Sequence, residues 1–157
     1  MNKKGFTLIE LLAVISILGI LMVIAIPNVI SIIDKGKKDT FINDAKKFIS
    51  LAEYEVGIDP NKKPVISGQS TTVFLQYVDY TDILDTPDGD KYDIETSKVI
   101  VKNNGGALKY YVLLKPKKVD GRGVDLADLE ILNSNERYKC VKNSNLISDV
   151  INAKLCQ

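Results

Sequence analysis

Apolar side chains dominate the first third of the chain. Residues 11–33 carry no charged side chain, and Ser16, Asn28 and Ser31 are their only polar residues. A run of roughly 20 apolar residues is long enough to cross the hydrocarbon core of a bilayer as a helix. The pattern therefore predicts a membrane-spanning helix, and a chain of 157 residues leaves room for one modest domain after it.

The helical period continues past the apolar run, through residues 34–57. Apolar residues recur there at spacings of one, three and four, which is typical of a helix with one buried face. Gly57 and then Asp59-Pro60 end the pattern, because glycine caps helices and proline cannot continue them. We expect a single helix of about 50 residues, or about 75 Å at ~1.5 Å per residue. The apolar stripe consists of Phe41, Ile42, Ala45, Phe48, Ile49, Ala52 and Val56, and the polar face of Lys37, Lys38, Asp39, Asp44, Lys46 and Lys47.

Short β-rich runs alternate with turn signals after the helix. Residues 98–102 and 108–114 are strand-like, and the Asn-Asn-Gly-Gly sequence at 103–106 predicts a hairpin between them. Residues 137–142 alternate charged and less polar side chains and are expected to add a third strand. Residues 72–78 fit a strand or one face of a helix, and both interpretations stay open.

The other segments complete an α+β outline. Residues 58–72 are expected to form a loop, and residues 120–123 (Asp-Gly-Arg-Gly) a turn. A long coiled coil is the alternative for the helix, but heptads do not persist beyond two or three turns. We therefore expect the helix to pack on an antiparallel sheet of three or four strands. A short C-terminal helix is predicted from Leu146, Ile147, Val150, Ile151 and Leu155.

A short basic segment precedes the apolar run, and Glu10 is the only acidic residue there. By the positive-inside rule, Lys3 and Lys4 predict a cytoplasmic N terminus. A secretory signal has its cleavage site after the apolar residues. Here the plausible cut lies before them, between Gly5 and Phe6, so the mature protein would keep the apolar segment.

Residues 3–10 (KKGFTLIE), followed by an apolar helix with Pro27 inside it, resemble the class III leader of type IV pilins and pseudopilins. The resemblance covers roughly the first third of the chain, and its ordered motif is specific. It implies cleavage after Gly5 by a membrane-embedded prepilin peptidase and N-methylation of Phe6. It also implies a pilin-like fold, in which the long helix packs on a small antiparallel sheet. The expected division is a leader at 1–5, a transmembrane or filament-core helix at 6–33, its amphipathic continuation at 34–57 and a globular head at 58–157.

Glu10 has two interpretations. In the first, the carboxylate lies at the membrane edge and reaches the interfacial water, because at the bilayer centre it would cost a few kcal/mol. In the second, Glu10 pairs with the α-amine of Phe6 on a neighbouring chain and fixes the axial stagger. The resemblance favours the second interpretation. Gly19 and Pro27 weaken the helix, which implies either a simple kink near 25–28 or partial unwinding as subunits pack.

The resemblance implies a structural subunit of an extracellular type IV pilus, formed as a homopolymer by helix bundling. Assembly would require a platform protein and an ATPase. The chain would be a single-pass membrane protein in contact with lipid before assembly and part of a cell-surface fibre afterwards. Adhesion, twitching motility or aggregation would be its roles. A pseudopilin of a type II secretion or DNA-uptake system is the alternative.

The charge balance argues against nucleic-acid binding. Lys and Arg total 21 and Asp and Glu total 20, and removal of residues 1–5 leaves 19 basic side chains. A nucleic-acid interface requires a basic face. The chain has no His, no nucleophile elbow and no phosphate-binding loop, so a tethered enzyme or ligand-binding domain is disfavoured and no cofactor is expected.

Cys140 and Cys156 are the only cysteines. In an extracellular chain they predict a disulfide. Closing a loop of ~15 residues would stabilise the fold by about 3 kcal/mol in the chain-entropy model. Two reduced cysteines are the alternative.

Four aspartates, at Asp85, Asp88, Asp90 and Asp93, lie around a Pro-Asp-Gly-Asp sequence. Carboxylates near a glycine turn are ligands for Ca²⁺. The spacing lacks the calcium loop of an EF-hand, and turns rich in Asp and Gly are common without metal. The four residues are therefore only a weak calcium candidate.

Overall fold

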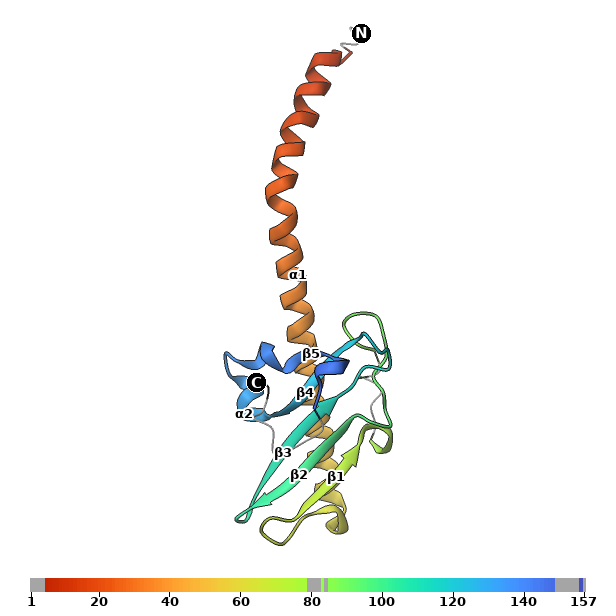
Figure 1. Cartoon of the computed structure of the whole chain (residues 1–157), viewed down its shortest axis with the longest axis vertical. Helices are drawn as coiled ribbons and strands as arrows, with labels where there is room; N and C mark the ends of the chain where they lie inside the picture. Colours follow the sequence, from red (N-terminus) through yellow and green to blue (C-terminus); the bar gives the residue numbers. More distant parts are fainter. Residues whose placement is uncertain (1–4, 79–82, 84, 149–155, 157) are drawn as a thin grey trace. The chain divides into compact units, whose positions relative to one another are not determined.

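The computed structural model describes residues 5–78, 83, 85–148 and 156. The chain forms two compact units, residues 1–36 and residues 37–157. One helix, α1 (Leu8–Ile58), begins in the first unit and ends in the second. Figure 1 shows the ribbon with the elements labelled.

In the first unit, α1 is long and apolar enough to cross a membrane. Its apolar side chains are about half exposed or more in the single chain, from 47% for Val14 upward. Two of its polar side chains, Ser16 and Asn28, donate to backbone carbonyls one turn earlier, at 2.7 Å and 3.2 Å. The helix therefore leaves neither of these side chains without a partner, and its whole apolar surface remains available to lipid or to other chains.

The helix remains regular across Gly19 and Pro27. Proline has no N–H, so the carbonyl of Val23 loses its usual helical donor. The single chain accommodates this loss without a break in α1. Partial unwinding in a filament stays a prediction.

In the second unit, α1 buries the stripe that its sequence predicts. Every member of the stripe is at most 2% exposed. Asp44 corrects the prediction, since it was assigned to the polar face and is only 7% exposed. The hydroxyl of Tyr92 donates to its carboxylate at 2.9 Å, so the buried acid has a partner.

The sheet has five antiparallel strands in the order β1-β2-β3-β4-β5. One face of the sheet packs against the buried stripe of α1, and Figure 1 shows this part of the helix running behind the strands. The predicted α+β class is thus confirmed, although three or four strands were expected. The strands are β1 (Ser70–Phe74), β2 (Lys98–Asn104), β3 (Ala107–Leu114), β4 (Arg122–Asp128) and β5 (Val141–Asn143). The short helices are η1 (Pro60–Lys62), η2 (Leu75–Tyr77), α2 (Leu129–Asn133), η4 (Arg137–Cys140) and η5 (Ser144–Leu146).

The hairpin between β2 and β3 is confirmed. Its register runs from Lys98 opposite Leu113 to Asn104 opposite Ala107, which leaves Gly105 and Gly106 as a two-residue turn. Their φ angles of 68° and 96° fit a type I′ turn, in which both central residues need positive φ.

Two other expectations need correction, and one open question is resolved. Residues 120–123 were expected to be a turn, but β4 begins at Arg122. Residues 137–142 are mostly the η4 helix, and only Val141–Asn143 pair as a strand. Residues 72–78 turn out to be the end of β1 followed by η2.

The predicted C-terminal helix lies largely outside the described residues, which omit 149–155. Leu146 ends the η5 helix, and Ile147 follows it without helical structure. Ile147 packs against a small apolar cluster of Ile100, Leu113 and Leu126, separate from the main core.

The cysteines form the predicted disulfide, Cys140–Cys156, which joins residues 16 positions apart. Both are buried, and both belong to the main core with the α1 stripe. The bond therefore holds Cys156, near the C-terminal end, against the same core that α1 fills.

Replacing Tyr92 with Phe is expected to lower the free energy of unfolding by about 1–3 kcal/mol, because the buried carboxylate of Asp44 loses its donor. Burial raises the pKa of Asp44 and the hydrogen bond from Tyr92 opposes that rise. Urea unfolding of the full chain in detergent micelles measures the effect. The control is Tyr77→Phe, at a tyrosine that is 68% exposed. Equal stability of the two variants would contradict the role of the bond.

Candidate processing and assembly site

The first turn of α1 is capped by three reciprocal hydrogen bonds between Thr7 and Glu10. The Glu10 carboxylate accepts from the Thr7 backbone N–H at 2.8 Å and from its hydroxyl at 2.7 Å. The Glu10 N–H donates in return to the Thr7 hydroxyl oxygen at 3.3 Å. This arrangement is a capping box, which satisfies N–H groups that have no partner within the helix.

The sequence analysis did not single out Thr7. The signal was present in Thr7-Leu8-Ile9-Glu10, because Ser or Thr followed three residues later by Glu before an apolar run marks a helix start. In the single chain Glu10 is therefore a capping residue. This local role is a third interpretation, beside contact with interfacial water and pairing between chains.

Gly5 and Phe6 lie directly before the capped turn. Phe6 is 85% exposed, and a Cβ atom built at Gly5 meets no atom within 4 Å. The three residues of the predicted processing and assembly motif thus lie within one short exposed segment. Neither Gly5 nor Phe6 contacts the Glu10 carboxylate in the described bonds.

The second unit holds a separate ionic cluster around Asp88. Arg122 of β4 donates to both carboxylate oxygens of Asp88, from Nε at 2.7 Å and from Nη2 at 2.8 Å. Lys37 of α1 adds a contact of 3.1 Å. The bonds from Arg122 and Lys37 lower the pKa of Asp88 to about 2. The loop that carries Asp88 is thereby joined to both α1 and β4.

The other calcium candidates do not join Asp88. Asp90 accepts from the backbone N–H of Lys118 at 2.8 Å, and Asp93 accepts from the backbone N–H groups of Glu95 and Thr96. Asp85 forms an isolated β-bridge with Lys91. Among the described residues no three carboxylates gather in a way that would hold a metal ion. The predicted cluster is thus a set of turn and ion-pair residues in this structure.

A second polar contact joins η4 to α1. The Tyr138 hydroxyl donates to Asp39 at 2.7 Å, and Arg137 donates to the same hydroxyl at 2.9 Å. Arg137 also lies 3.6 Å from Asp39. Because Cys140 follows in η4, this contact and the disulfide hold the segment after α2 near the part of α1 that carries Asp39.

Comparison with known proteins gives two kinds of match. A family model described as the prokaryotic N-terminal methylation motif matches residues 1–26. The type IV wide pilus major component PilA4 of Thermus thermophilus is 51% identical over 58 residues, which are 34% of this chain and 44% of that protein. The match thus spans less than half the length of PilA4.

Two fimbrial proteins of Pseudomonas aeruginosa are each 29% identical over 138 residues, which cover 76% of this chain and 82% of theirs. No solved structure matches the chain. With the leader motif, the capped apolar helix and the α+β head, these matches confirm the resemblance. The chain is thus similar to type IV pilins in its leader motif and, at lower identity, along most of its length.

Asp88→Asn is expected to change how stability depends on pH. The pKa of Asp88 is lower in the folded chain than in the unfolded one. Its ion pairs therefore stabilise the fold fully above about pH 4, and this contribution is lost as pH falls towards about 2. The variant should be less stable at pH 7 and should lose less stability between pH 4 and pH 2.

Urea midpoints of the full chain in micelles at three pH values test this expectation. Asp120→Asn, on the neighbouring exposed turn, is the control. A wild-type fall below pH 4 that Asp88→Asn leaves unchanged would contradict the assignment.

Proposed function

We propose that this protein is a structural subunit of an extracellular type IV pilus. The observation that carries the proposal is Glu10, a carboxylate at the head of a helix that has no other charge through residue 33. A charge drawn into an apolar environment is costly unless it is paired. Side-by-side packing of such helices would bury Glu10, and a neighbouring chain would have to supply the partner.

Cleavage between Gly5 and Phe6 would create that partner. The new α-amine of Phe6, N-methylated as in the family, carries a positive charge four residues from Glu10. In a bundle, the Glu10 of one chain pairs with the Phe6 amine of the next. A slip of one residue would leave both charges unpaired, so the pair fixes the axial stagger.

The capping box supports this proposal because it orders the same carboxylate. Both bonds from Thr7 end on Oε2 of Glu10. The other oxygen, Oε1, would accept the neighbour's amine. The single-chain cap and the intermolecular pair can therefore coexist, and the cap holds the acid in place before a neighbour arrives.

Before assembly, the helix would span the membrane with its N terminus in the cytoplasm and the head outside. A prepilin peptidase would remove residues 1–5, and a platform protein and an ATPase would drive polymerisation. Unwinding between Gly19 and Pro27 would let the helices adapt in the filament. The heads would cover the fibre and make contacts for adhesion, motility or aggregation.

A pseudopilin of a type II secretion or DNA-uptake system is the second candidate. The same leader and helix favour it, because it would use the same processing and bundling. The names of the matched relatives refer to a pilus and to fimbriae, which favours the pilus subunit. Abundance of the protein in sheared surface fibres would separate the two.

Substitutions at Glu10 and Thr7 distinguish pairing from capping. Glu10→Gln retains the capping box but removes the charge, Glu10→Ala removes both, and Thr7→Ala removes the hydroxyl cap and retains the charge. We expect both Glu10 variants to be cleaved normally but to be absent from sheared fibres when no wild-type chain is present. Thr7→Ala should still assemble. Immunoblots of membrane and sheared fractions measure the outcome, and normal assembly of Glu10→Gln would contradict the charge pairing.

Substitutions at Gly5 test the cleavage site. Because a Cβ atom at Gly5 has open space, neither Gly5→Ala nor Gly5→Trp should disturb the folded chain. Gly5→Ala should be cleaved at least in part, whereas the bulky Gly5→Trp should block the peptidase and leave the longer chain in the membrane. Intact mass reports both outcomes, and efficient cleavage of Gly5→Trp at the same bond would contradict the assigned role of Gly5.

A further inference from the structure

The head has an apolar pocket where β3 continues past the end of β4. The pairing of these strands stops at Tyr111 opposite Asp128, and the chain then turns into α2. On the side of β3 that faces β4, no described strand pairs with residues 107–110. A cavity of about 230 Å³ lies there, which we call the α1–β3 pocket. It is lined by Glu53, Leu108, Lys109, Tyr110, Asp128, Leu129 and Glu130.

The α1–β3 pocket is apolar with an acidic rim. Leu108, Tyr110 and Leu129 supply its apolar surface, and three of its other lining residues are acids against one lysine. Burial raises the pKa of Tyr110, and the neighbouring Glu53 carboxylate raises it further. The pocket is therefore suited to an aliphatic side chain accompanied by positive charge.

The head also presents such a group. Val119 is 83% exposed, more than any other large apolar side chain described from residue 37 onward. Lys117 and Lys118 precede it and are exposed too, whereas Asp120 follows it. We call residues 117–121 the Val119 turn.

The backbone of the Val119 turn is held in place. The Lys118 N–H donates to Asp90, and the Gly121 N–H donates to the Lys118 carbonyl at 3.0 Å. The Ser144 hydroxyl donates to the Val119 carbonyl. An ordered turn loses less conformational entropy on binding than a mobile one, so the exposed valine is presented at low cost.

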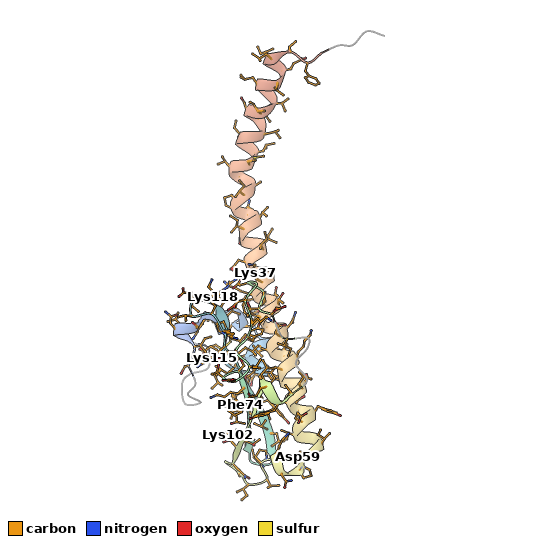
Figure 2. The ribbon with its side chains drawn as sticks, turned by 90° about the vertical axis from the view of Figure 1, so that its right-hand side faces the viewer. Lys37, Asp59, Phe74, Lys102, Lys115 and Lys118 are labelled. Carbon is orange, nitrogen blue, oxygen red and sulfur yellow. A yellow bond between two sulfur atoms is a disulfide. The ribbon has the colours of Figure 1, made fainter. Side chains whose placement is uncertain are left out.

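The turn and the pocket lie towards opposite ends of the head. Figure 2 shows Lys118 beside Lys37 at one end and Asp59 at the other. Glu53 follows Lys37 by 16 positions on α1, or about 24 Å along the helix. Val119 therefore does not reach the pocket of its own chain, and complementary patches at different places on one molecule build head-to-tail assemblies.

We propose that the Val119 turn of one copy docks in the α1–β3 pocket of a second copy. Val119 lies against Leu108, Tyr110 and Leu129 of the second copy, and Lys117 and Lys118 lie near Glu53 and Glu130. The inference rests on the proposed function, since an open chain of such contacts builds a filament. It adds a contact between the globular parts of neighbouring chains to the contacts within the helix bundle.

Disulfide trapping tests the contact in filaments sheared from the cells that make this protein. We expect the double variant Val119→Cys with Leu129→Cys to give a ladder of cross-linked chains on mild oxidation. Each single variant should give none. The matched control is Val119→Cys with Ile66→Cys, because Ile66 is 70% exposed but lies outside the pocket. Filaments without a ladder, or an equal ladder in the control, would overturn the docking while the pilus proposal stands. Absence of wild-type filaments would overturn both.

A charge exchange gives a second readout. Lys118→Glu and Glu130→Lys should each lower the yield of sheared filaments, by roughly fivefold, because each places like charges together at every contact. The combined variant should recover to within about twofold of wild type, as coupled neighbours do in a double-mutant cycle. Losses that simply multiply in the combined variant would show that the two residues do not meet.

Discussion

The carboxylate of Glu10 is the constraint from which the proposed assembly follows. It stands at the head of a helix whose next 23 residues carry no charge. Lipid or neighbouring helices around that segment would leave a lone carboxylate at high energy. In the single chain, Thr7 supplies two hydrogen bonds, which order the acid without neutralising it. Neutralising the Glu10 carboxylate still requires a positive charge at the same level along the helix bundle. The proposed cleavage would create such a charge on every chain.

The spacing of apolar residues and the turn residues were enough to predict much of the fold. The stripe from Phe41 to Val56 was predicted because a helix repeats its faces at fixed spacing, and the Gly105-Gly106 hairpin because only glycine easily takes positive φ. The start of β4 was missed because Gly121 just before it and Gly123 within it imitate a turn. A Cβ atom at Gly123 would lie 2.2 Å from the Leu114 carbonyl oxygen, so glycine at this position lets β3 and β4 approach closely.

The sequence predicted which residues form the candidate site, but it did not predict the tertiary contacts of the buried and paired aspartates. Gly5, Phe6 and Glu10 were found by their order along the chain, whereas the cap formed by Thr7 was missed although it also depends on neighbours in sequence. The partners of Asp88 and Asp44 were not, because Arg122 and Tyr92 approach them only through the tertiary fold. An aspartate on a helix or turn has the same local pattern whether it binds a metal, an arginine or a tyrosine.

The central claim is that cleavage at Gly5–Phe6 creates the chain that assembles. Intact mass and N-terminal sequencing of the protein from membranes and from sheared surface fibres test it most directly. The account predicts fibres built from a chain that starts at N-methylated Phe6. A chain that still starts at Met1 in cells with an active prepilin peptidase would contradict it.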